Sequence, residues 1–189
     1  MQKTEMRNPD TINIDKMSTG DILRIINREN MNSVMAVEKA IDRIEKACDA
    51  IISGMEKGGR LFYIGAGTSG RLGIVDAAEC PPTFGVSKDL VVGIIAGGHE
   101  SMFAASEGAE DNYEAGAEDL GKYDIKDNDT VVGISAAGNA AYILGALEFA
   151  KEKGAETIGI TCNEKSKLDK AADISIVTDT GAEVVTGST

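Results

Sequence analysis

A glycine-rich segment is the part of the sequence with the clearest capacity for chemistry. Residues 65–73 read Gly-Ala-Gly-Thr-Ser-Gly-Arg-Leu-Gly and directly follow the apolar run 61–64. Glycines let backbone N–H groups approach an anion closely, and the N-terminus of a following helix adds partial positive charge. We therefore predict a phosphate site here, with contacts from Gly67, Thr68, Ser69, Gly70 and Arg71.

The same glycines also match the spacing of a dinucleotide-binding fingerprint. That site requires an acidic residue at the end of the second strand to hold a ribose hydroxyl, whereas this sequence reads Ala96-Gly97-Gly98 there. The hydroxyls of Thr68 and Ser69 suit a terminal phosphate monoester, for which each charge-assisted hydrogen bond contributes roughly 1.5–3 kcal/mol. We favour a sugar phosphate, with a dinucleotide or a tight turn without ligand as the alternatives.

The elements that must position this loop are short and apolar. Runs of this kind predict five strands, at 61–64, 90–95, 130–134, 157–161 and 174–177. Their near-continuous apolar character is typical of strands covered on both faces, as in a parallel sheet. The stretches between them, such as 140–153, have a helical pattern. The sequence therefore predicts an α/β fold, a doubly wound five-stranded parallel sheet flanked by helices.

The first 57 residues predict a helical extension. Ser18, followed three residues later by Asp21, is a helix-start signal. A second helix is expected from about Asn32 to Lys57, since apolar residues recur there at helical spacing, and Gly58-Gly59 should end it. We expect residues 1–57 to pack on a domain formed by 58–189. That domain lacks a helix to cover its last strand, which predicts a C-terminally truncated chain.

Composition narrows the classes of function. The 189 residues carry a net charge of −12, which argues against binding to nucleic acid or an anionic membrane. No apolar run approaches the roughly 18–20 residues of a membrane span, and the polar start lacks a signal-peptide core, so a cytoplasmic protein is expected. Three scattered cysteines and one histidine, His99, indicate neither a disulfide framework nor a zinc site. We expect no metal and no cofactor.

Several segments together resemble one family. They are 65–85, containing Gly-Thr-Ser-Gly-Arg-Leu-Gly and Glu-Cys-Pro-Pro; Ser-Glu-Gly-Ala-Glu-Asp at 106–111; Gly-Ala-Glu-Val-Val-Thr-Gly-Ser at 181–188; and Arg-Asn-Pro, Ile-Asp and Met-Ser-Thr near the start. These segments are similar to the N-acetylmuramic acid 6-phosphate etherases, and the similarity spans essentially the whole chain. The resemblance implies a sugar isomerase (SIS) type of α/β domain and the N-terminal portion of a longer protein.

The resemblance also implies a reaction. The family cleaves the D-lactyl ether of N-acetylmuramic acid 6-phosphate, giving N-acetylglucosamine 6-phosphate and D-lactate, during cell-wall sugar recycling. Glu79 and Glu110 match its two catalytic positions, with Glu79 expected as the acid and Glu110 as the base at C2. Without the resemblance, Glu79 reads as an exposed carboxylate where Cys-Pro-Pro ends a helix, and Glu110 as part of a solvated acidic helix face.

A second loop departs from the family pattern. Etherases typically show Ser-Gly-Arg-Thr-Pro-Tyr, whereas residues 137–142 read Ala-Gly-Asn-Ala-Ala-Tyr, so hydroxyls and a positive charge are missing. We expect substrate contacts from Ser135, Gly138 and Asn139. The resemblance further implies a homodimer whose subunits share their sites. A non-catalytic sugar-phosphate sensor or regulator and an aldose-ketose phosphate isomerase remain as alternatives.

Overall fold

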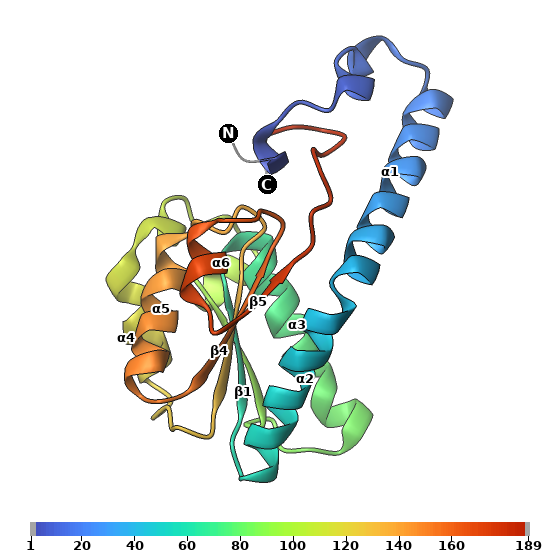
Figure 1. The fold of residues 1–189 in the computed structure, drawn as a ribbon. Helices are drawn as coiled ribbons and strands as arrows, with labels where there is room; N and C mark the ends of the chain where they lie inside the picture. Colours follow the sequence, from blue (N-terminus) through green and yellow to red (C-terminus); the bar gives the residue numbers. More distant parts are fainter. Residues whose placement is uncertain (1–2, 188–189) are drawn as a thin grey trace.

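The computed structural model describes residues 3–187, and their centre is a five-stranded sheet. The strands are β1 (Leu61–Gly65), β2 (Val91–Ile95), β3 (Thr130–Ile134), β4 (Glu156–Thr161) and β5 (Ile174–Val177). Every pair is parallel and the order is β2-β1-β3-β4-β5 (Figure 1). In the register, Gly65 pairs with both Ile95 and Ile134, so the carboxyl ends of β1, β2 and β3 are level. The predicted parallel sheet and its strand positions are confirmed.

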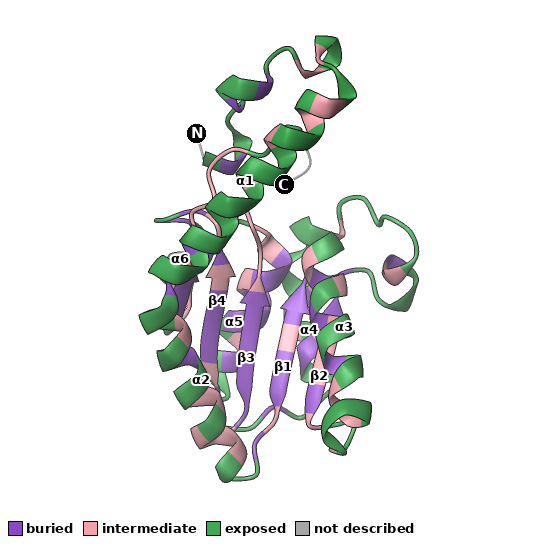
Figure 2. Ribbon diagram, turned by 90° about the vertical axis from the view of Figure 1, so that its right-hand side faces the viewer, coloured by how far each residue is buried: buried purple, intermediate pink, exposed green. Residues whose placement is uncertain are grey.

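Helices cover both faces of this sheet. On one face lie α2 (Ile41–Glu56) and α3 (Gly67–Phe84), and on the other α4 (Tyr113–Gly121), α5 (Ala141–Glu152) and α6 (Lys167–Ala171) (Figures 1 and 2). Consecutive residues of β3 point to opposite faces: Val131 packs into the cluster under α4 and α5, and Val132 into the cluster under α2. Both are buried, which explains why the strands read as continuous apolar runs.

The N-terminal helices differ from the prediction. Helix α1 (Thr19–Lys39) begins as expected after Ser18, whose hydroxyl accepts a hydrogen bond from the Asp21 N–H at 3.2 Å. It continues through the expected second start near Asn32, because no glycine or proline interrupts it, and the break falls at Ala40. The predicted start at Asn32 was therefore wrong. Ala40 is buried beside the sheet, so the break directs α2 onto the domain while α1 projects beyond it (Figure 1). The 57/58 boundary stays a prediction.

The prediction that Cys-Pro-Pro ends a helix was also wrong. Helix α3 includes Pro81 and Pro82 in its last turn and ends only at Phe84. Two missing N–H groups at this position cost few hydrogen bonds, and Gly85 closes the helix in the left-handed conformation (φ 68°), donating to the Pro81 carbonyl at 2.9 Å. Glu79 consequently lies within the helix.

The two ends of the described chain lie together above the carboxyl edge of the sheet (Figure 1). The short turn η1 (Lys3–Glu5) docks on the residues after β4, where the Lys3 N–H donates to the Asn163 side chain at 3.0 Å. Lys3 also forms an ion pair with Asp179, and Asn8 donates to the Ala182 carbonyl. Ser188, in the C-terminal motif, is outside the described residues. Within 3–187, every helix is too short or too polar to span a lipid bilayer.

Candidate functional site

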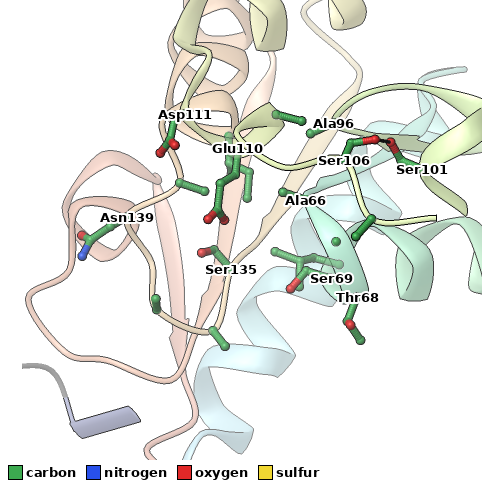
Figure 3. Close-up of a pocket in the computed structure, with 18 of the residues that line it drawn as sticks. Ala66, Thr68, Ser69, Ala96, Ser101, Ser106, Glu110, Asp111, Ser135 and Asn139 are labelled. Atoms are coloured by element: carbon green, nitrogen blue, oxygen red, sulfur yellow. Dashed lines mark hydrogen bonds between the residues drawn. The ribbon is translucent and has the colours of Figure 1, made fainter. Parts of the chain in front are cut away.

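A cavity of about 780 Å³ opens at the carboxyl edge of the sheet. Its walls are the loops that follow β1, β2 and β3, which the register brings to one level (Figure 3). The chain visits β2 on one side of β1 and then crosses to β3 on the other side, so the cavity lies at the point where the strand order reverses. Ligands of open α/β sheets bind at this switch point.

The glycine-rich loop ends in a helix N-terminus that faces the cavity. Ala66 is the N-cap of α3 and has no side-chain acceptor, and Gly67 begins the helix with a φ of 54°, which favours glycine. The first N–H groups of a helix have no partner within the helix, and here no capping side chain satisfies them. Gly67, Thr68 and Ser69 line the cavity, as predicted for an anion site.

Two of the predicted glycines act behind the cavity wall. Gly70 is buried, and a Cβ there would lie 2.7 Å from the Gly65 carbonyl oxygen, so it permits α3 to approach β1 closely. Gly138 has a φ of 74°, and a Cβ there would lie 2.4 Å from the Ser166 hydroxyl. Neither lines the cavity. Both shape the backbone that does.

The second loop leads into another uncapped helix N-terminus. Ala140 is the N-cap of α5 without a side-chain hydrogen bond, and it lines the cavity. The Ser135 hydroxyl lines the cavity too and accepts the Gly138 N–H at 3.0 Å. Asn139 lines the outer wall and accepts the Lys167 N–H at 3.4 Å. The backbone donors of α3 and α5 thus converge on one space.

Glu110 belongs to this space. It lies in the short turn η5 (Ala109–Asp111), and Ala109 packs against the core under α5, which fixes the turn. The Glu110 carboxylate, Ser69 and Ser135 lie around the same part of the cavity (Figure 3). A carboxylate so placed can accept a proton from a ligand whose phosphate is held at the N-terminus of α3.

Glu79 lies elsewhere. It is exposed, about three turns along α3 from Gly67, and does not line the cavity. The helical spacing places it on one face with Leu72 and Val75, whose exposed fractions are 60% and 54%, while Gly73 and Ala77 of the opposite face are buried. One chain therefore does not bring Glu79 and Glu110 together, and their joint action stays a prediction.

Sequence reasoning missed several residues of the cavity. Ser101 is only 2% exposed and its hydroxyl lies 2.6 Å from that of Ser106. Glu5 reaches the cavity because η1 docks there, and Glu107 and Asp111 flank Glu110. Only Glu107, Asp111 and Ser106 carried a signal, through the motif at 106–111. Among residues 3–187, no group of histidine, cysteine or acidic side chains is arranged to hold a metal ion.

Comparison with known families decides the classification. The family model described as the glucokinase regulatory protein N-terminal SIS domain matches residues 43–151. The chain belongs to this SIS-domain family.

Relatives of the SIS domain give the finer similarity. An N-acetylmuramic acid 6-phosphate etherase of Clostridium beijerinckii is 54% identical over 186 residues, which cover 98% of this chain and 61% of the relative. The chain therefore spans about 61% of the length of the curated relatives that it matches. The predicted resemblance to the N-terminal portion of these etherases is confirmed.

Solved structures support the fold of the SIS domain. Phosphoheptose isomerase GmhA from Neisseria gonorrhoeae has a TM-score of 0.63 at 17% identity, over 85% of this chain and 86% of that chain. A protein of E. coli, solved in complex with a sugar phosphate, has a TM-score of 0.58 at 24% identity, over 89% of this chain and 79% of that chain. The predicted SIS-type fold is confirmed.

Proposed function

We propose that the protein carrying this SIS domain cleaves the D-lactyl ether of N-acetylmuramic acid 6-phosphate, giving N-acetylglucosamine 6-phosphate and D-lactate. The observation that carries the proposal is the cavity in which Glu110 faces the uncapped N-terminus of α3. Relatives that are about half identical to the chain bear the name of this activity. The role in cell-wall sugar recycling and the cytoplasmic location belong to the same proposal and come from the resemblance.

The phosphate of the substrate is the anchor. The N–H groups of Gly67, Thr68 and Ser69, with the Ser69 hydroxyl, hold it at the N-terminus of α3. The sugar then extends from the phosphate across the cavity toward Glu110 and Ser135. The E. coli neighbour with its bound sugar phosphate supports this class of ligand.

Two carboxyl groups are sufficient for the chemistry. In the open-chain sugar, C2 lies next to the C1 aldehyde, so a base can remove the C2 proton and the electrons delocalise into the carbonyl. Collapse of this enolate forms a C2–C3 double bond and breaks the C3–O bond, while an acid protonates the departing lactate oxygen. Water then adds at C3 and a proton returns to C2. Glu110 is the proposed base and Glu79 the proposed acid.

Glu79 reaches this cavity from a second copy of the chain. It shares an exposed face of α3 with Leu72 and Val75, and an apolar stripe of this kind is suited to burial in a subunit interface. The stripe begins near Thr68, at the rim of the cavity. A homodimer that pairs these faces therefore brings each Glu79 toward the partner's cavity.

The test is release of D-lactate by the full-length protein. Glu79→Gln and Glu110→Gln should each reduce turnover by about 10²–10⁴-fold, as expected for loss of an acid or base. Glu118→Gln, which removes an exposed carboxylate outside the cavity, should change little. Unaltered turnover in both glutamine variants of the proposed acid and base would refute the assigned roles.

Mixed dimers test the shared site directly. If each site takes Glu110 from one chain and Glu79 from the other, a dimer of one Glu79→Gln and one Glu110→Gln subunit keeps one intact site. Random mixing should then restore about a quarter of wild-type activity. Failure to restore activity in proven mixed dimers would show that the two glutamates act within one chain.

The alternative functions give different products. Binding of N-acetylglucosamine 6-phosphate by the wild-type protein, with no D-lactate formed, would identify a sensor. Interconversion of an aldose phosphate and a ketose phosphate would identify an isomerase. Calorimetry and sugar-product analysis separate these outcomes.

A further inference from the structure

The connection between β2 and α4 carries Glu110 but has little structure of its own. It runs from Ala96 to Asn112 and contains two short turns, η4 (His99–Met102) and η5. Gly97, Gly98 and Gly108 adopt positive φ angles of 82°, 72° and 73°. Phe103 at its tip is 80% exposed. A segment of this kind needs an external contact to hold one position over the cavity.

Arg71 supplies that contact. Its Nε donates to the Met102 carbonyl at 3.1 Å, and its Nη2 donates to the Ala104 carbonyl at 3.2 Å. In the described structure, the other hydrogen bonds of residues 99–111 stay within 98–111. Arg71 thus makes the hydrogen bonds that tie the tip of this segment to another element.

We infer that Arg71 is a positioning residue that holds the Glu110 segment over the cavity, and not the phosphate ligand that the sequence suggested. Two of the three guanidinium nitrogens are already engaged by carbonyl oxygens. The planar guanidinium spans two carbonyls, which the point charge of a lysine cannot do with the same geometry. The catalytic consequence rests on the proposed etherase function, whereas the positioning itself does not.

The placement of Arg71 couples the two halves of the site. Arg71 follows Gly67 by four residues, so it lies one turn into the same helix whose N-terminus is proposed to bind phosphate. Four carboxylates line the cavity, Glu107 and Glu110 among them, and Arg71 is the basic residue of the described lining. One side chain therefore fixes the distance between the anchored end of a substrate and the base that must reach it.

The experiment compares Arg71→Gln and Arg71→Lys with Arg43→Gln in the full-length protein. Arg43 is a matched control, because its Nε donates to the Ser175 carbonyl at 3.0 Å, far along the chain from the cavity loops. Hydrogen–deuterium exchange of residues 99–111, calorimetric binding of inorganic phosphate, and kcat and KM for D-lactate release are measured for each protein.

Both Arg71 variants should lose exchange protection in residues 99–111 while Arg43→Gln keeps it. Displacement of a catalytic group by about 1 Å costs roughly 100-fold, so kcat should fall by about that factor, with KM and phosphate affinity changed by no more than about threefold. Unchanged exchange with phosphate affinity reduced about tenfold or more in Arg71→Gln, and retained by the charged lysine, would overturn the inference and make Arg71 an anion ligand.

Exchange and phosphate binding decide the inference even if the wild-type protein releases no lactate. In that case the proposed function fails while the positioning role is still judged by exchange. If Arg71→Gln does not fold, Arg71→Lys carries the test, because it keeps the charge and removes the paired contact.

Discussion

The uncapped N-terminus of α3 leads to a prediction in which stability and binding change in opposite directions. Ala66 has the extended backbone of an N-cap (φ −116°, ψ 150°), so an acceptor at its Cβ can reach the Thr68 or Ser69 N–H. Replacing alanine by a capping residue contributes about 0.5–2 kcal/mol, which for a chain of this size raises Tm by roughly 2–4 °C per kcal/mol. The same N–H groups are the proposed phosphate donors.

Ala66→Ser and Ala66→Asp should therefore bind phosphate less well. Losing one charge-assisted hydrogen bond costs roughly 1.5–3 kcal/mol, which corresponds to about 10–100-fold weaker binding for the serine variant. The aspartate adds repulsion between its carboxylate and the phosphate, so its binding should be weaker still. The serine variant is the more sensitive probe, because it adds a single hydroxyl to a half-buried residue.

Calorimetry with inorganic phosphate and N-acetylglucosamine 6-phosphate, together with thermal unfolding, measures both effects. Ala78→Ser, which adds the same hydroxyl to an exposed residue in the interior of α3, controls for the substitution itself. Phosphate affinity within about threefold of wild type for Ala66→Asp would refute the claim that the helix N-terminus holds the anion.

Three further predictions concern the frame of the site. Asn163→Ala should lower stability by about 2 kcal/mol and raise KM, because this 4%-exposed amide donates to Thr4 at 2.9 Å and so docks the turn that places Glu5 in the cavity; calorimetric unfolding and kinetics measure both effects. Asp129→Asn should lower the free energy of unfolding by about 3 kcal/mol, because its 1%-exposed carboxylate accepts Arg60 Nη2 at 2.7 Å. Burial opposes ionisation, yet hydrogen bonds from Arg60 lower the pKa of Asp129 below 3.8, so its contribution is present above that pH and is lost as pH falls through the lower folded pKa; acid unfolding should lose this component in the variant. Leu72→Lys should give monomers in sedimentation and abolish turnover while phosphate affinity is retained; a dimeric, active variant would refute the α3 interface.

Much of the fold could be predicted because its strands are buried on both faces. The run at 130–134 gives one β3 residue to each side of the sheet in turn, so apolar content marked the strand without alternation. The N-terminal helices were harder to delimit. Val34 and Val37 recur at the spacing of a core face but are 59% and 44% exposed, because α1 projects beyond the sheet. Periodicity predicts a helical face but does not say whether a partner covers it.

The site was predictable where one segment suffices and not where distant segments meet. Gly67 and Ser69 could be placed because strand, turn and helix are consecutive. Glu5 reaches the same cavity only through the docking of η1 on Asn163, nearly the whole chain away, and no local pattern reports that contact. Arg71 had the right position but its hydrogen bonds lead to carbonyls of a loop, which sequence spacing does not reveal.

The altered second loop is compatible with anion binding because backbone donors do not depend on side-chain identity. Loss of the family's hydroxyls and arginine removes side-chain contacts, yet Ala140 leaves the N-terminus of α5 uncapped and facing the cavity. Tyr142, which matches the family pattern, acts elsewhere: it is fully buried and donates to Asp119 at 2.7 Å, tying α5 to α4. The loop therefore keeps the structural part of the family pattern and the backbone donors. Differences in its side chains should change which sugar is accepted more than whether a phosphate is bound.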